Sequence, residues 1–214
     1  MGGCPFAVAG VSLMLRPGQS SYFERTMHAA VDTFLRNGTL PFVGRREEVE
    51  EILDLWRHAV DAGRMRAMSV TAEAGSGKSR LLDEVIDLVR TEGGSVIHAK
   101  LYPEAKVDLV RAIAGGIAGD PALERFGVDA EKSSIDDVAG VVRRISRLRR
   151  TLLVIEDIHL LPEEAHADLE QLLRGIADET LAMLVATRPV ELGPRGILEP
   201  YLVRNRVMQG LVSE

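Results

Sequence analysis

One glycine-rich stretch constrains the fold of this chain more than any other feature. It runs from Ala72 to Ser79 with the sequence AEAGSGKS, and it follows an apolar run over residues 68–71. After it, apolar residues recur at helical spacing over residues 81–86. A strand, a glycine-rich turn and a helix that opens on Lys and Ser together form a site suited to phosphate groups. The pattern therefore predicts an α/β fold with an anion site between a strand and a helix.

Each residue type in this stretch has a physical role at such a site. Gly75 and Gly77 let the backbone bend until its N–H groups converge on phosphate oxygens. Lys78 supplies a positive charge near the outer phosphates, and the Ser79 hydroxyl is suited to binding Mg²⁺. The plainer alternative is an ordinary turn before a basic helix start. The candidate ATP-binding residues here are Ala72, Glu73, Ala74, Gly75, Ser76, Gly77, Lys78, Ser79 and Arg80.

Two adjacent acids form the second half of the candidate site. The apolar run over residues 152–155 is typical of a strand buried on both faces of a parallel sheet, and Glu156 and Asp157 follow it. Acids placed there emerge at the carboxyl end of the strand, where open α/β sheets bind ligands. One carboxylate can hold Mg²⁺ while the other orients and deprotonates an attacking water. The alternative is a pair of acids that caps the turn after the strand.

Strand and helix patterns alternate along most of the chain, which predicts a mostly parallel sheet. Strands are predicted at residues 67–71, 95–101, 151–155 and 181–186, with a weaker one at 206–212. Helices are predicted at residues 21–37, 47–62, from the glycine-rich stretch to about 89, and at 109–117, 135–148 and 162–176. Ser134 is expected to cap the helix over residues 135–148.

Composition narrows the class of protein. The chain has 214 residues, of which 46% are hydrophobic, enough for one sizeable core. A net charge of −6 argues against broad nucleic-acid binding. Cys4 is the only cysteine, so no internal disulfide forms, and a cytoplasmic location is expected. The apolar run over residues 6–15 is too short to span a bilayer. One local basic patch comprises Arg143, Arg144, Arg147, Arg149 and Arg150.

Four segments in order resemble one known family. They cover residues 42–48 (FVGRREE), 70–82 (VTAEAGSGKSRLL), 153–159 (LVIEDIH) and 185–189 (VATRP). Together they resemble the AAA-type P-loop ATPase domain of STAND signalling proteins, which includes LuxR-type regulators of the MalT kind and ATPase modules near nucleotide cyclase domains. The resemblance implies a three-layer P-loop NTPase fold with a mostly parallel five-stranded sheet. In that sheet the sensor strand (residues 181–186) would lie between two others. One is the Walker B strand, which precedes Glu156 and Asp157, and the other is the P-loop (Walker A) strand, which precedes Ala72.

The resemblance also implies roles for individual residues. Val43, Gly44 and Arg45 would lie by the adenine of ATP. Glu156 would be the Mg²⁺-side acid and Asp157 the catalytic base, although the family's usual order is Asp first. Arg188 would be a sensor near the terminal phosphate, and the alternative is a surface arginine before a proline turn. A further departure is Ala72, which stands where the P-loop consensus has glycine.

At the level of the whole chain, ATP with Mg²⁺ would act as a switch that promotes self-association or binding of a partner protein. Residues 1–39 are expected to form an extension with one amphipathic helix, and residues 40–214 the ATPase core. The helical lid and winged-helix module of the family would follow, so we interpret the chain as an N-terminal fragment. Nucleic acid would be bound only through such further domains.

Three functions remain open on the sequence alone. The leading one is a slowly hydrolysing ATP switch, for which Arg149 or Arg150 could serve as an arginine finger in trans. The second is a nucleotide-gated interaction module without meaningful hydrolysis. The third is a small-molecule kinase, for which the sequence offers no recognisable cluster of lid arginines.

Overall fold

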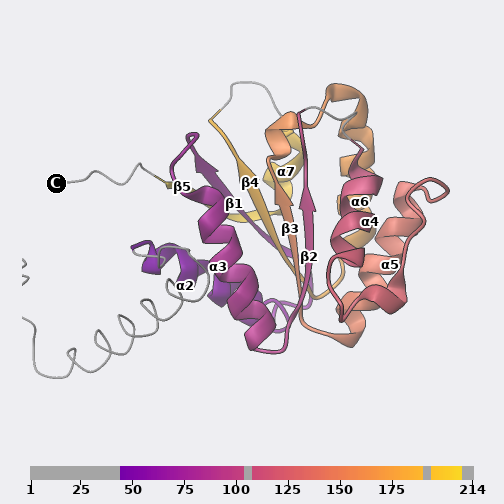
Figure 1. The fold of residues 1–214 in the computed structure, drawn as a ribbon, viewed down its shortest axis with the longest axis horizontal. Helices are drawn as coiled ribbons and strands as arrows, with labels where there is room; N and C mark the ends of the chain where they lie inside the picture. The colour runs from indigo at the N-terminus through magenta and orange to yellow at the C-terminus, as the bar shows by residue number, and fades with distance from the viewer. Residues whose placement is uncertain (1–43, 104–107, 190–193, 209–214) are drawn as a thin grey trace, which may run out of the picture. The chain divides into compact units, whose positions relative to one another are not determined.

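A five-stranded parallel sheet forms the centre of the molecule. The structure is a computed structural model that describes residues 44–103, 108–189 and 194–208. The strands lie in the order β2-β3-β4-β1-β5, and every pairing is parallel (Figure 1). Their bounds are β1 Arg66–Ala72, β2 Ser95–Lys100, β3 Thr151–Glu156, β4 Ala182–Thr187 and β5 Leu202–Met208.

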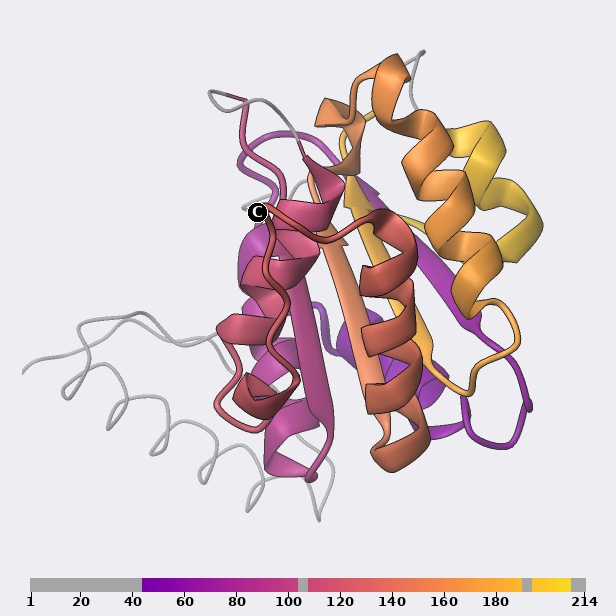
Figure 2. The same ribbon diagram turned by 90° about the vertical axis from the view of Figure 1, so that its right-hand side faces the viewer.

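Helices cover both faces of the sheet, which gives three layers (Figures 1 and 2). The helices α2 and α3 lie on one face, and α4, α5, α6 and the short α7 lie on the other. Their bounds are α2 Arg46–Arg57, α3 Lys78–Thr91, α4 Leu109–Ala118, α5 Ile135–Leu148, α6 His166–Ile176 and α7 Arg195–Leu198. Among the described residues, no helix combines the length and the apolar character that crossing a membrane requires.

The central strands are apolar along their whole length because both of their faces are covered. All six residues of β3 are buried, and so are five of the six in β4. Alternate residues serve different layers. Leu153 and Ile155 join the core beneath α4, α5 and α6, whereas Leu152 and Val154 point to the opposite face. Glu156 continues this second set, on the side of the sheet that α3 covers.

Local sequence signals explain where several helices begin. Ser134 accepts a hydrogen bond from the backbone N–H of Asp137, whose carboxylate accepts one from the backbone N–H of Ser134. This capping box satisfies two N–H groups that the helix α5 leaves unpaired. The predicted helix over residues 135–148 is confirmed with those bounds. In α4 the side chain of Asp108 caps the first turn in the same way, by accepting from the backbone N–H of Arg111.

Other predictions need correction. The helix predicted at residues 47–62 ends at Arg57. Residues 58–63 form turns in which Ala59 is buried and Val60 is 47% exposed, so the apolar residues do not continue one buried helical face. The helix predicted from residue 162 becomes regular only at His166, after a short 3₁₀ turn. The strand predicted at residues 206–212 begins earlier, at Leu202. Three polar residues in its centre interrupt the apolar pattern of a strand. They are tolerated because β5 is an edge strand that pairs with the sheet on one side only. The helix predicted at residues 21–37 lies outside the described residues.

The predicted position of the acid-bearing strand is confirmed. The strand β4 lies between β3, which carries the two acids, and β1, which leads into the glycine-rich stretch. The chain therefore has the three-layer α/β architecture expected from its sequence. Because all strands run in the same direction, their carboxyl ends meet at one edge of the sheet.

Candidate nucleotide site

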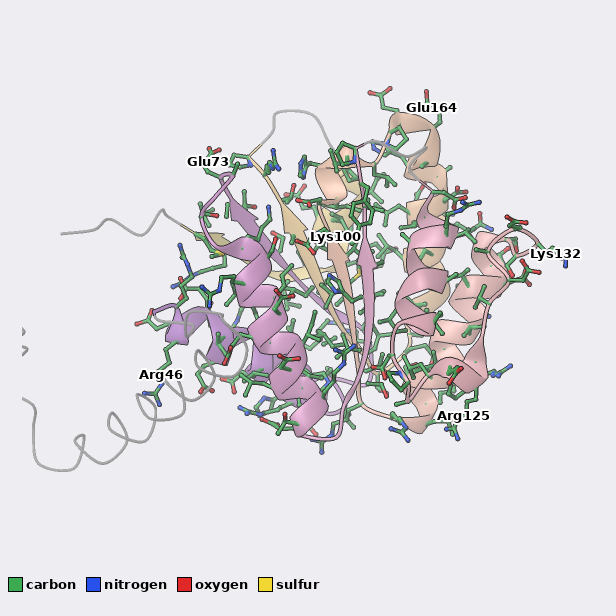
Figure 3. The ribbon with its side chains drawn as sticks, viewed as in Figure 1. Arg46, Glu73, Lys100, Arg125, Lys132 and Glu164 are labelled. Carbon is green, nitrogen blue, oxygen red and sulfur yellow. The ribbon has the colours of Figure 1, made fainter. Side chains whose placement is uncertain are left out.

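The glycine-rich turn, defined here as residues 72–79, lies at that edge between β1 and α3. Ala72 is the buried last residue of β1, and Glu73, Ala74 and Gly75 are exposed. Figure 3 shows Glu73 at the tip of the turn. The Ser76 hydroxyl donates to the carbonyl of Glu73 at 2.7 Å, which closes the turn on itself.

Two glycines give this turn its shape. Gly75 has φ of +78° and Gly77 has φ of +85°, both in the left-handed region that side chains with a Cβ rarely adopt. Nothing lies within 4 Å of where a Cβ would stand on either of them. Their requirement is therefore conformational, and the space in front of the turn is open. The helix α3 starts directly after Gly77 without a side-chain cap, so the N–H groups of its first turn are available to bind an anion.

Lys78 contacts Asp157, one of the two acids of the site. Its side chain is 8% exposed, and its Nζ lies 3.5 Å from Oδ1 of Asp157. Asp157 follows β3 directly and has φ of +59°, which is unusual for a residue other than glycine. Because of this backbone conformation, the side chains of Glu156 and Asp157 point in different directions. It leaves the carboxylate of Asp157 beside Lys78.

Glu156 is the second acid and lies almost completely within the protein, with 2% of its surface exposed. The Ser79 hydroxyl donates to its Oε1 at 2.6 Å. His98 Nε2 lies 3.1 Å from its Oε2, and Lys100 Nζ lies 3.3 Å from Oε1. His98 and Lys100 both project from β2, where Lys100 is the register partner of Glu156. One buried carboxylate thus collects three donors from two elements.

These contacts set the protonation state of Glu156. Burial alone raises the pKa of a carboxyl group, because the charged form loses its water. Hydrogen bonds from His98 and Ser79, together with the charge of Lys100, outweigh burial and lower the pKa of Glu156 from 4.5 to about 2. Glu156 is therefore an anion at neutral pH, and His98 Nε2 acts as the donor in their contact.

The Ser79–Glu156 pair has the donor chemistry that Mg²⁺ requires. A hydroxyl and an ionised carboxylate oxygen stand next to each other at the mouth of the glycine-rich turn. Mg²⁺ prefers hard oxygen ligands and is commonly held by one or two protein groups together with phosphates. The residues present therefore fit this ion, with Ser79 and Glu156 as its candidate ligands.

The segment predicted to lie by the adenine touches the same turn. Val43 lies outside the described residues, and Gly44 is exposed with φ of +87°. The guanidinium of Arg45 donates to the carbonyl of Ser76 at 3.0 Å and lies 3.4 Å from the carboxylate of Glu48. The start of α2 is thereby attached to the glycine-rich turn, although the two are separated by some thirty residues in sequence.

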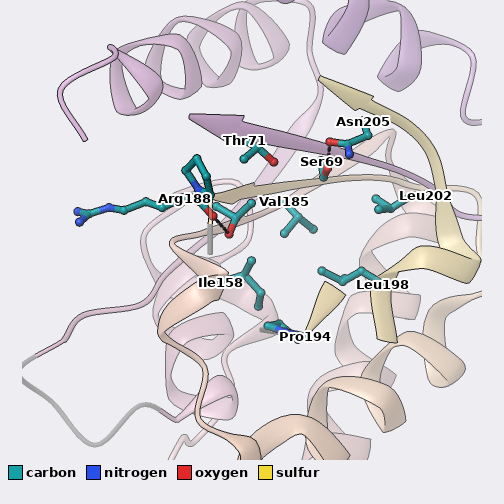
Figure 4. Close-up of a pocket in the computed structure, with 11 residues that line it drawn as sticks. Ser69, Thr71, Ile158, Val185, Arg188, Pro194, Leu198, Leu202 and Asn205 are labelled. Carbon is teal, nitrogen blue, oxygen red and sulfur yellow. Dashed lines mark hydrogen bonds between the residues drawn. The ribbon is translucent and has the colours of Figure 1, made fainter. Parts of the chain in front are cut away.

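Arg188, the predicted sensor, is connected to the site in this structure through its backbone. Its side chain is exposed, and the guanidinium extends away from the neighbouring labelled residues (Figure 4). Its backbone N–H donates to Nδ1 of His159 at 3.4 Å. Burial is the main reason that the pKa of His159 is lowered, so the ring is neutral and Nδ1 can accept. His159 also lies 4.0 Å from Asp157.

A cleft on the other face of the sheet adjoins the end of β4 (Figure 4). It combines apolar side chains such as Ile158 and Leu202 with the polar pair Ser69 and Asn205, in which the Ser69 hydroxyl donates to the Asn205 side chain at 2.7 Å. Arg188 also lines this cleft, whereas α3 covers the opposite face of the sheet (Figure 2).

Sequence reasoning missed His98 and Lys100. A signal was available, because these two polar residues alternate with the buried Ile97 and Ala99 in β2 and so had to share one face. The arginines proposed as fingers, Arg149 and Arg150, precede β3 and lie at its amino end, away from the chain's own site. Any role for them in catalysis would have to be in a second molecule.

Comparisons with known proteins agree with this fold. The structure of the Aeropyrum pernix ORC2 protein in ADPNP–ADP complexes is similar with a TM-score of 0.54 and 15% identity, covering 78% of this chain and 48% of that one. A chain from the Drosophila ORC structure with poly(dA/dT) DNA and Cdc6 is similar with a TM-score of 0.56 and 9% identity, covering 98% and 36%. At these identities the likeness shows the fold alone. No curated protein sequence matches the chain.

The chain thus spans about half of the first structure's length and about a third of the second. One family model matches residues 41–185, which include the glycine-rich turn and both acids. Since this match covers more than half of the sequence, the chain belongs to the AAA ATPase domain family.

Proposed function

We propose that this chain is an ATP-binding switch domain that hydrolyses ATP slowly and acts within a larger signalling or transcription-regulatory protein. One observation supports this most: Lys78 and Ser79, adjacent at the start of α3, each contact a different acid at the end of β3. A cation and a hydroxyl facing two carboxylates beside an open glycine-rich turn suit a triphosphate and its metal ion.

Each group has a distinct part in binding. The N–H groups of the glycine-rich turn and the first turn of α3 would bind the phosphate oxygens. Lys78 would leave Asp157 and bind the outer phosphates, and Arg45 would keep the start of α2 next to the adenine. The resemblance adds Val43 and Gly44 to the adenine contacts. Ser79 and Glu156 would hold Mg²⁺, which neutralises phosphate charge when bound.

Hydrolysis would depend on Asp157. Once Lys78 moves to the phosphates, the carboxylate of Asp157 is free to orient a water and accept its proton. The water oxygen would form a bond to the terminal phosphorus as the bond to the ADP oxygen breaks. Aspartate is one methylene shorter than glutamate, so a more distant water and a slow reaction are expected. Arg188 would assist only after its side chain turns toward the phosphates.

The wider role rests on the resemblance to STAND proteins. ATP binding would favour self-association or binding of a partner protein in the cytoplasm, and hydrolysis would reverse it. The ORC2 structure, which has a similar fold, was solved in ADPNP–ADP complexes, and this supports the proposal that the present chain binds a nucleotide. A module that binds nucleotide without hydrolysing it is the second candidate, favoured by the order of the two acids, Glu156 before Asp157, which reverses the usual order of the family it resembles.

Calorimetry with Mg²⁺ and ATP tests binding. We expect the wild-type chain to bind and the Lys78→Ala variant to lose about tenfold or more in affinity, because a charge-assisted contact contributes about 1.5–3 kcal/mol. The matched control is Lys132→Ala, which removes a lysine that is 84% exposed and pairs only with Asp129 in the described structure. Equal affinity of wild type and Lys78→Ala would refute the proposed site.

Phosphate release under the same conditions separates the switch from the module. Replacing Asp157 by Asn should lower the rate by about 10²-fold or more, the usual contribution of a general base. ATP affinity should be unchanged or tighter, since Lys78 no longer has an acidic partner there. Equal rates for wild type and Asp157→Asn, both at background, would favour the module without hydrolysis.

A further inference from the structure

Lys100 contacts the carboxylate oxygen of Glu156 that would bind a metal ion. Its ammonium lies 3.3 Å from Oε1 of Glu156, and this is the same oxygen to which the Ser79 hydroxyl donates. The second carboxylate oxygen, Oε2, is taken by His98. An ion held by Ser79 and Glu156 would therefore meet the charge of Lys100 directly, whereas His98 stands on the other oxygen.

The side chain of Lys100 is not confined to this contact. It is 36% exposed, while the carboxylate it contacts is 2% exposed. On its outer side lies Tyr102, which is 57% exposed and whose ring centroid is 5.9 Å from the ammonium. An aromatic face at this distance attracts a cation weakly. In one position Lys100 thus contacts the acid and lies within reach of an aromatic ring that it could approach more closely.

We propose that Lys100 is an exchangeable counter-cation for Glu156. In the absence of nucleotide it balances the buried carboxylate, and when Mg²⁺ arrives with ATP it withdraws toward Tyr102 and solvent. Lys100 thereby sets how strongly ATP binding depends on Mg²⁺. This inference rests on the proposed function, because it assumes that ATP and Mg²⁺ bind at the glycine-rich turn.

The charge of Lys100 should have opposite effects on the binding of metal-free ATP and on the binding of ATP with Mg²⁺. Without the metal, Lys100 screens the triphosphate from the negative charge of Glu156 and so favours binding. With the metal, the ammonium competes for Oε1 and repels a divalent cation at close range. Removing the charge should weaken binding of ATP alone and strengthen binding of ATP with Mg²⁺.

The measurable quantity is the ratio of two ATP dissociation constants, one with Mg²⁺ chelated and one with Mg²⁺ saturating, obtained by calorimetry. In Lys100→Met we expect this ratio to rise about tenfold over wild type, as removal of one charge a few ångströms away at a partly exposed site would give. Lys100→Arg keeps the charge and should leave the ratio at or below that of wild type. The control Lys132→Met, far from Lys100 in Figure 3, should not change it.

Tyr102→Leu provides an independent test at an exposed position that should tolerate the change. Without the ring, withdrawal of Lys100 costs more, so the ratio should fall about two- to threefold. An unchanged ratio in both Lys100→Met and Tyr102→Leu would overturn the inference. So would a lower ratio in Lys100→Met, which would make Lys100 a phosphate ligand. If wild type itself bound no ATP, the proposed function would fail instead.

Discussion

At the scale of single residues, the acidic side chains of the candidate site have hydrogen-bond and charge partners within the protein when no nucleotide is bound. Glu156 receives hydrogen bonds from Ser79 and His98 and the charge of Lys100, and Asp157 contacts Lys78. The sequence identified both acids and their partners on α3, because these belong to local motifs. It did not reveal the contribution of β2, since the approach of Lys100 to Glu156 depends on the pairing of two strands.

This arrangement predicts how stability depends on pH in the nucleotide-free protein. Glu156 has a pKa of about 2 when folded and 4.5 ordinarily, so it stabilises the fold above pH 4.5 and loses that effect as pH falls toward 2. The full contribution is about 3 kcal/mol, and a little under half of it is lost by about pH 3.5. Urea unfolding of wild type and Glu156→Gln across this range measures it. Parallel pH profiles of the two proteins would contradict the assigned contacts.

At the scale of elements, the glycine pair in α4 has a different meaning from the one that the sequence indicates. Gly115 and Gly116 predict a weakened helix, yet α4 runs unbroken from Leu109 to Ala118. A Cβ on Gly116 would lie 2.7 Å from the carbonyl oxygen of His98, so this glycine permits close packing of α4 on β2. Such a contact depends on the tertiary structure, and no local pattern announces it.

The two neighbouring glycines should therefore respond in opposite directions to the same change. Gly116→Ala forces α4 away from rigid backbone and should lower the free energy of unfolding by about 1–3 kcal/mol. Gly115 is exposed, and nothing lies within 4 Å of a Cβ built on it, so Gly115→Ala should raise it by up to about 1 kcal/mol. Chemical denaturation of both variants measures the difference. Similar values for the two would mean that α4 does not contact β2 as described.

At the scale of the whole molecule, the parallel sheet determines where the candidate site lies. The glycine-rich turn, the two acids and the end of β4 come from separate parts of the sequence, and they meet because the strands share one direction. Alternation of strands and helices was sufficient to predict this edge. The lower accuracy at β5 has a physical cause, since Arg206 of this edge strand pairs with Glu47, Glu48 and Glu51 near the start of α2 and gives no apolar pattern.

A crystal structure of the chain with Mg²⁺ and a non-hydrolysable ATP analogue tests the central claim most directly. The terminal phosphate should lie within hydrogen-bonding distance of Lys78 Nζ, which will have left Asp157, with the metal ion beside Ser79 and Glu156. The phosphates should lie against the N–H groups that follow Gly75. A nucleotide bound elsewhere, with Lys78 still paired to Asp157 and the glycine-rich turn empty, would contradict the account.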